Sequence, residues 1–139
     1  AFIVGVKSTK LSILEKNFLN RYKPWGVILF TRNIKSVKQV KDLTNSIKDL
    51  FNDKKYPILI DQEGGRVNRL QHLISSNTLS SKFYGSLYLK NEKKFQTLYE
   101  LFVDKTSLIL KDLGININTV PVLDLNIKGS SKEVKTFVF

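Results

Sequence analysis

Residues 57–70 read PILIDQEGGRVNRL, a short apolar run followed at once by a polar segment that contains two glycines. The run from Pro57 to Ile60 is continuously apolar, which is typical of a strand buried on both faces. Parallel sheets covered by helices contain strands of this kind, and they bind ligands at the carboxyl ends of the strands. The polar segment that begins at Asp61 is therefore the first candidate for a functional site.

Three further apolar runs also predict strands: Phe2 to Val6, Gly26 to Phe30, and Ile115 to Leu125 with a break at Pro121. Segments with helical spacing separate the runs, and strands that alternate with helices form a parallel α/β architecture. The architecture is either a barrel or a doubly wound sheet. A complete barrel needs about 250 residues, so a length of 139 residues alone favours the doubly wound fold.

Local signals predict three helices. The first runs from about residue 12 to 22 and starts at a capping box formed by Ser12 and Glu15. The second follows Ser36 as its N-cap. The third spans roughly residues 92–113 and is ended by Gly114. A long loop is expected between the third strand and this last helix.

The composition excludes several kinds of site. The chain has no cysteine and one histidine, His72, so disulfides, thiolate metal sites and histidine clusters are ruled out. It lacks an apolar run long enough to span a membrane, and its first residues lack the pattern of a secretory signal. We expect a cytoplasmic protein with no metal and no membrane partner.

The formal net charge is +11, from 23 Lys and Arg residues against 12 Asp and Glu residues. Such a surplus can attract nucleic acid. The lysines are scattered along the predicted helices, however, and no nucleic-acid-binding motif accompanies them. We expect a solvated surface and no nucleic-acid partner, and a basic nucleic-acid-binding domain is the rival hypothesis.

The polar segment at residues 61–69 combines acids, arginines and paired glycines. The glycines allow positive φ and a sharp turn, so that the side chains around them converge. Arginine supplies forked donors and aspartate supplies acceptors, which suits sugar hydroxyls or an anionic group. The alternative is purely structural: Glu63 pairs with Arg66, and Asp61 caps the next turn.

Three segments resemble glycoside hydrolases of family three, in the group of the bacterial β-N-acetylhexosaminidases. They are GVILFTRN at 26–33, PILIDQEGGRVNRL at 57–70, and GININ at 114–118, which leads into PVLD at 121–124. Their order and spacing fit across nearly the whole chain, and DQEGGRV is specific to this group. The resemblance implies the N-terminal half of a TIM (β/α)8 barrel, with about four parallel strands and intervening helices.

The resemblance also implies an activity. Enzymes of this group remove terminal N-acetylglucosamine with retention, through a covalent glycosyl-enzyme intermediate, and need no metal or other cofactor. In bacteria they commonly act on muropeptides during peptidoglycan recycling in the cytoplasm. The expected partner is accordingly a small carbohydrate, an N-acetylglucosaminide.

By motif match, Asp61 and Arg69 take the substrate-binding positions of the group. We interpret the residues between them as a loop scaffold: Glu63, Gly64, Gly65 and Arg66. No catalytic group is expected in this chain, because the histidine loop and the aspartate nucleophile of the group are absent. His72 is expected to be an exposed loop residue instead.

Residues 126–139 read as a divergent tail, so residues 1–139 are expected to form one partial barrel domain that is truncated at its C-terminus. Four strands cannot close a barrel, and the open edges would require a missing C-terminal half or another copy of the chain. The alternative is a catalytically inactive sugar-binding or remnant α/β domain.

Overall fold

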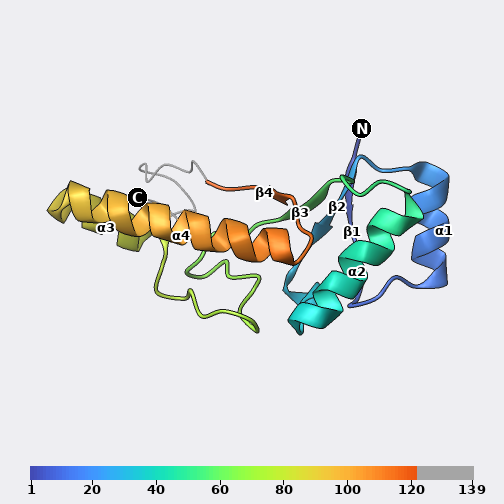
Figure 1. Cartoon of the computed structure of the whole chain (residues 1–139), viewed down its shortest axis with the longest axis horizontal. Coiled ribbons are helices and arrows are strands. Elements are labelled where there is room, and N and C mark those ends of the chain that lie inside the picture. Colours follow the sequence, from blue (N-terminus) through green and yellow to red (C-terminus); the bar gives the residue numbers. More distant parts are fainter. Residues whose placement is uncertain (122–139) are drawn as a thin grey trace, which may run out of the picture.

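The computed structural model of the chain describes residues 1–121. The predicted tail at 126–139 and the last part of the fourth predicted strand, 122–125, lie outside the described residues. The centre of the fold is a four-stranded sheet (Figure 1). Its strands are β1 (Ile3–Gly5), β2 (Gly26–Leu29), β3 (Ile58–Ile60) and β4 (Ile117–Asn118). All neighbouring strands are parallel, as predicted.

The strands lie in the sheet in chain order, β1-β2-β3-β4. In a doubly wound sheet the strand order reverses at a switch point, so that the first strand lies inside the sheet. Here β1 lies at an edge, and each connection moves to the next strand in the same direction, as it does around a barrel. The order therefore favours an open half barrel over the doubly wound fold that length alone favoured.

Three helices form where local signals predicted them. α1 (Ile13–Tyr22) starts at the capping box, in which the Glu15 N–H donates to Ser12 Oγ at 3.2 Å and the Ser12 N–H donates to Glu15 Oε2 at 2.9 Å. α2 (Val37–Leu50) follows its N-cap Ser36. α4 (Glu92–Asp112) is followed by Gly114, which has a φ of 77°.

The prediction of a long loop before the last helix is wrong in part, because the segment contains α3 (Ser81–Lys90). Gly85 weakens the local helical pattern of this segment. Contacts with α4 stabilise α3 instead. The ring centroid of Tyr84 lies 4.9 Å from that of Tyr99 and 5.6 Å from that of Phe102. α3 and α4 form a hairpin that extends away from the sheet (Figure 1).

The hydrophobic core lies between the sheet and the helices that cover one of its faces. β2 and β3 contribute the fully buried side chains Val27, Leu29, Ile58 and Ile60. α2 contributes Val40, Leu43 and Ile47 to the same cluster. This core fixes the positions of the strand ends, where the candidate site lies.

Candidate functional site

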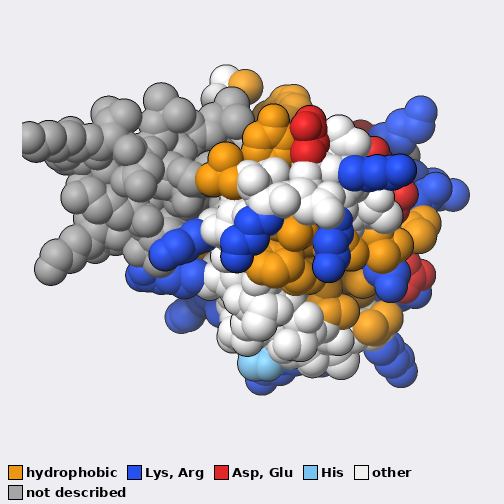
Figure 2. Space-filling model, turned by 90° about the vertical axis from the view of Figure 1, so that its left-hand side faces the viewer, with side chains coloured by type: hydrophobic (Ala, Val, Ile, Leu, Met, Phe, Trp, Pro, Cys, Tyr) orange, Lys and Arg blue, Asp and Glu red, His pale blue; other side chains and the backbone are white. Residues whose placement is uncertain are grey.

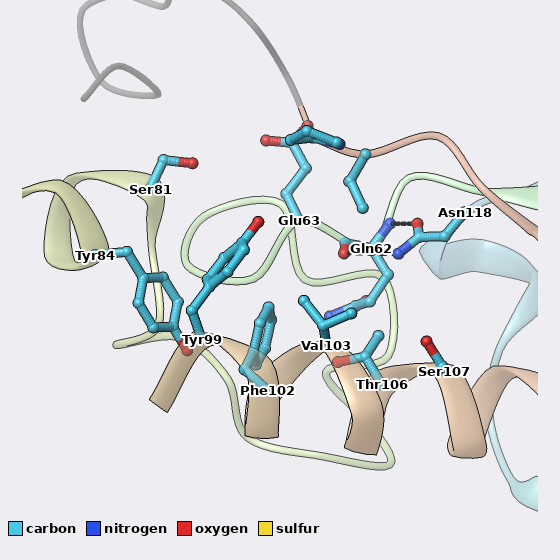
Figure 3. A pocket seen from close by; sticks show the side chains of 12 residues that line it. Gln62, Glu63, Ser81, Tyr84, Tyr99, Phe102, Val103, Thr106, Ser107 and Asn118 are labelled. Atoms are coloured by element: carbon cyan, nitrogen blue, oxygen red, sulfur yellow. Dashed lines mark hydrogen bonds between the residues drawn. The ribbon is translucent and has the colours of Figure 1, made fainter. Parts of the chain in front are cut away.

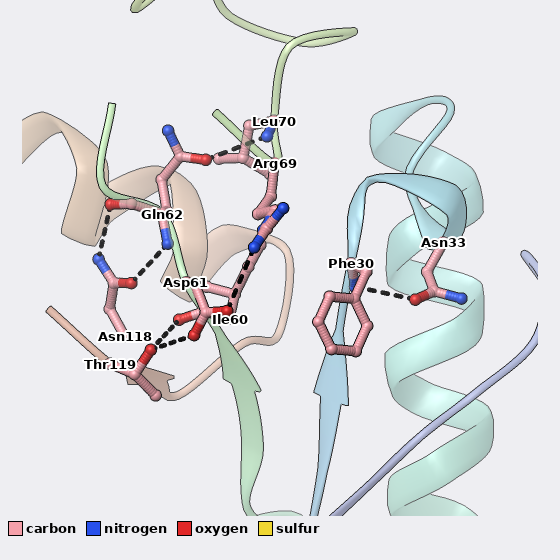
Figure 4. A network of polar contacts seen from close by, with 9 residues as sticks. All are labelled: Phe30, Asn33, Ile60, Asp61, Gln62, Arg69, Leu70, Asn118 and Thr119. Atoms are coloured by element: carbon pink, nitrogen blue, oxygen red, sulfur yellow. Dashed lines mark hydrogen bonds and ion pairs between the residues drawn. The ribbon is translucent and has the colours of Figure 1, made fainter. Parts of the chain in front are cut away.

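The register of the sheet aligns three residues at the carboxyl ends of its strands (Figure 4). Leu29 of β2 pairs with Ile60 of β3, and Ile60 pairs with Asn118 of β4. The residues that follow this row are Phe30, Asp61 and Thr119. Because side chains alternate along a strand, these three project from the same face of the sheet.

Asp61 is held at both of its carboxylate oxygens. Nη2 of Arg69 lies 3.4 Å from Oδ2, and the hydroxyl of Thr119 donates a hydrogen bond to Oδ1. The side chains of Arg69 and Asp61 are 28% and 29% exposed, so a ligand can reach the pair. Nε of Arg69 is buried and has no acceptor among the described residues. The structure thus brings the two residues of the predicted substrate site together; their binding of a substrate stays a prediction.

Phe30 lies between two arginines. The guanidinium carbon of Arg32 is 4.5 Å from the ring centroid, and that of Arg69 is 5.6 Å away. Arg32 is also tied to the end of β1, since its Nε donates to the carbonyl of Val6 at 3.1 Å. Gly5 leaves room for this packing, because a Cβ there would lie 3.0 Å from Phe30 Cε2. Arg32 was not predicted from the sequence, although its place shortly after β2 is a signal that could have found it.

Gln62 fixes the loop that carries Arg69. Its side chain is buried; Oε1 accepts from the Leu70 N–H at 3.0 Å, and Nε2 donates to Asn68 Oδ1 at 3.0 Å. The Asn118 side chain accepts from the backbone N–H of Gln62 at 3.0 Å and donates to its carbonyl at 3.3 Å. Gln62 was not among the predicted scaffold residues, since a neutral amide between two acids carries no sequence signal for such a role.

The two glycines of the loop have the positive φ that their pairing predicted, 85° at Gly64 and 58° at Gly65. Both also lie against the segment that leads into α3. A Cβ at Gly64 would lie 2.4 Å from the carbonyl oxygen of Leu79, and one at Gly65 would lie 2.6 Å from Ser80 Cβ. A side chain at either position would therefore force the loop away from α3.

A pocket of about 220 Å³ lies beside this loop, between the ends of β3 and β4 and the hairpin (Figure 3). Its lining includes Gln62, Glu63, Asn118, Tyr84, Tyr99 and Phe102. Gln62 and Asn118 alternate with Asp61 and Thr119 along the chain, so the pocket and Asp61 lie on opposite faces of the sheet. Burial, and to a lesser degree the charge of Tyr99, raises the pKa of Tyr84 to about 12.

The remaining residues singled out from the sequence lie at the surface or in the loop. Arg66 and His72 are exposed, and Glu63 lines the pocket just described. The pairing of Glu63 with Arg66 stays a prediction. Within residues 1–121, no group of three or more His, Cys, Asp or Glu side chains could hold a metal ion. None of the helices in this range is both long and apolar enough to cross a membrane.

Known proteins resemble this chain in sequence and in structure. It is 32% identical over 112 residues to beta-hexosaminidase A of Pseudoalteromonas piscicida, an alignment that covers 78% of this chain and 18% of that protein. It is 31% identical over 123 residues to the beta-hexosaminidase of Stenotrophomonas maltophilia, and this alignment covers 88% of this chain and 36% of that protein. The structure also superposes on NagZ from Neisseria gonorrhoeae, which was solved in complex with N-trifluoroacetyl-D-glucosamine. The TM-score is 0.80 at 28% sequence identity, and the superposition covers 89% of this chain and 37% of NagZ.

The chain thus spans well under half the length of these relatives. Its four parallel strands and helices match the N-terminal part of the NagZ barrel, and the sheet remains open as a half barrel does. The model of the glycosyl hydrolase family 3 N-terminal domain matches residues 4–138. The chain belongs to glycosyl hydrolase family 3, as a portion of its N-terminal barrel domain.

Proposed function

We propose that this chain supplies part of the substrate site of a retaining β-N-acetylhexosaminidase, with Asp61 and Arg69 as ligands of a terminal N-acetylglucosamine. The observation that carries the proposal is the position of Asp61 at the carboxyl edge of a parallel sheet, where its oxygens are fixed and still accessible. Relatives named beta-hexosaminidase, and one solved with a glucosamine derivative, support this substrate class.

The chemistry of the pair suits a neutral sugar. Each carboxylate oxygen offers two lone pairs, so Asp61 keeps acceptor sites after its contacts with Thr119 and Arg69. A sugar hydroxyl that donates to a carboxylate makes a charge-assisted hydrogen bond, worth about 1.5–3 kcal/mol. Arg69 keeps the carboxylate in place, and its other N–H groups can donate to sugar oxygens.

We place the bond-breaking groups outside residues 1–121. A retaining glycosidase with two carboxylates holds them about 5–5.5 Å apart, on either side of the scissile bond. Glu63 lines the pocket beside the hairpin, whereas Asp61 does not, so we do not assign these two acids to such a pair. By the family resemblance, a histidine loop and an aspartate nucleophile from the other half of the barrel would act, without a metal or other cofactor.

An exposed aromatic surface beside β1 supports the proposal that a C-terminal half of the barrel binds this chain. Four large side chains there are exposed: Phe2 by 46%, Phe18 by 42%, Tyr22 by 51% and Trp25 by 50%. The ring centroids of Phe18 and Tyr22 are 4.8 Å apart, and the backbone N–H of Trp25 donates a hydrogen bond to the backbone carbonyl of Phe2. Exposed apolar side chains that lie together mark interaction surfaces. We propose that the closing strands and helices of a C-terminal half cover this surface.

The biological setting is part of the same proposal. Cell-wall muropeptides recycled in the cytoplasm are the proposed source of the N-acetylglucosaminide. A carbohydrate, rather than nucleic acid or a membrane, is the proposed partner of the Asp61 site, since its arginines lie beside a carboxylate and an aromatic ring.

A chimera tests the proposal. Residues 1–121 would replace the matching segment of the Stenotrophomonas maltophilia beta-hexosaminidase, and hydrolysis of a chromogenic N-acetylglucosaminide would be measured. We expect an active chimera that loses at least about 100-fold in kcat/KM with Asp61→Ala, a loss of about 2.7 kcal/mol. Asp53→Ala, an exposed acid outside the site, is the control. A folded chimera whose activity does not depend on Asp61 would contradict the proposal.

A further inference from the structure

A second hollow lies along the helical hairpin, away from Asp61. It is an apolar groove of about 320 Å³ between α4 and the loop that precedes α3. Tyr84 and Thr106 are buried in it, whereas Phe83 and Leu101 are 40% and 49% exposed. Figure 2 shows hydrophobic side chains gathered on the hairpin end of the molecule, with basic side chains around them. The groove contains no residue of β1 or β4, so strand pairing at either edge of the sheet does not occupy it.

The groove runs along one face of α4. One wall is a stripe of α4 in which Leu98, Leu101, Lys105 and Ile109 recur three or four residues apart, and such residues share one helix face. At 1.5 Å per residue this stripe extends about 16 Å along the helix. An apolar lining of this length suits a linear alkyl chain.

The opposite wall uses part of its hydrogen-bonding capacity within the loop. The Ser76 carbonyl accepts from the N–H groups of Gly65 and Leu79. The carbonyl of Ile74 accepts from Asn68 Nδ2 at 3.1 Å. Along the apolar stripe of α4 a polar ligand would lose hydrogen bonds to water, whereas an alkyl chain has none to lose.

Lys105 is the one charged residue in the groove lining, as far as the described residues go. A lysine can lay its methylene stem along an apolar surface and keep its ammonium group in water, where it attracts an anion. Lys105 lies between Leu101 and Ile109 on the stripe. An anionic head at Lys105 would leave a tail in contact with Leu101 and Leu98.

We propose that this groove binds a free single-chain anionic amphiphile, with its head at Lys105 and its alkyl tail along Leu101, Leu98 and Phe83. The volume of the groove lies at the lower end of the range for small-molecule sites, about 300–1,000 Å³. A peptide helix is the other occupant that long apolar grooves take. The amphiphile fits better because it needs a single cation and no polar partners along its length. The inference does not depend on the sugar site.

Calorimetric titration of the 139-residue chain with dodecanoate, below its micelle concentration, tests the proposal. We expect saturable binding that Leu101→Asp weakens about tenfold or more, since the new carboxylate lies in the apolar groove. Lys105→Glu should weaken dodecanoate and strengthen dodecyltrimethylammonium. The matched control is Leu108→Asp, because Leu108 is 67% exposed on the same helix and does not line the groove.

The proposal is overturned if the folded chain shows no saturable binding, or if Leu108→Asp weakens binding as much as Leu101→Asp. Binding to anionic phospholipid vesicles or to an amphipathic helical peptide without binding to dodecanoate also overturns it. Circular dichroism reports whether each variant is folded. If Leu101→Asp unfolds, Lys105→Glu decides, because a charge reversal at this exposed position leaves the packing intact and must still invert the ligand preference.

Discussion

Thr119 donates a hydrogen bond to Asp61, and this bond joins the residues that directly follow β4 and β3 (Figure 4). We expect Thr119→Val, in the chimera, to weaken the binding of N-acetylglucosamine, because the carboxylate loses one of its two anchors. A hydrogen bond to a carboxylate is worth about 1.5–3 kcal/mol, which limits the loss of affinity to about 150-fold at most; a loss of about tenfold is expected. Thr119→Ser keeps the hydroxyl and should restore the affinity. Equal losses in both variants would point to the methyl group rather than the hydrogen bond.

Gln62 should matter for stability more than any charged residue of its loop. Gln62→Ala leaves the Leu70 N–H and the Asn68 carboxamide without their buried partner, which should lower the free energy of unfolding by about 2–4 kcal/mol. Urea denaturation measures the change. Gln71→Ala, at an exposed position of the same loop, should stay within about 0.5 kcal/mol of the parent. Equal effects of the two substitutions would contradict the role assigned to Gln62.

Two glycine substitutions should have opposite effects. Gly64→Ala forces a side chain into positive φ and against the Leu79 carbonyl, so we expect a loss of about 1–3 kcal/mol or more. Gly85→Ala, inside α3, should instead stabilise the chain by about 0.5–1 kcal/mol. Thermal unfolding of both variants checks the prediction. A Gly64→Ala chain as stable as the parent would show that the loop can move away from α3.

Glu15 should make the stability of α1 depend on pH. Burial alone would raise the pKa of Glu15, but hydrogen bonds from the Lys7 and Ser12 N–H groups and the Ser12 hydroxyl, with the charge of Lys7, lower it below 4.5. A lowered pKa in the folded state contributes stability above the ordinary value, and this stability is lost as the pH falls through the lowered pKa. Glu15→Gln should therefore destabilise the chain at neutral pH, and the difference should vanish in acid. A difference in unfolding free energy that persists well below pH 4.5 would be the contrary result.

The elements that the sequence predicted are those with local signals. The capping box at Ser12 and Glu15, the N-cap Ser36 and the terminating Gly114 act within a few residues, and all three are found in the structure. α3 was not predicted, because Gly85 weakens its local pattern and because it depends on contacts with Tyr99 and Phe102 of α4.

The site was predictable where one short motif contains both partners. Asp61 and Arg69 lie eight residues apart, and the loop between them returns the chain to the strand end. Thr119 lies 58 residues from Asp61 and reaches it only through the β3–β4 register, which the sequence does not specify. Arg32 reaches the carbonyl of Val6 at the end of β1 in a similar way, across the β1–β2 pairing.

The most direct test of the central claim is the affinity of the chimera for N-acetylglucosamine, measured by calorimetry before and after Asp61→Asn. The substitution keeps the shape of the side chain and removes its charge, so Arg69 and the sugar hydroxyls lose a charged acceptor. We expect the affinity to fall about tenfold or more, the loss of one charge-assisted hydrogen bond, with Asp53→Asn unchanged. An unchanged affinity in folded Asp61→Asn protein would contradict the assignment of this residue to the sugar site.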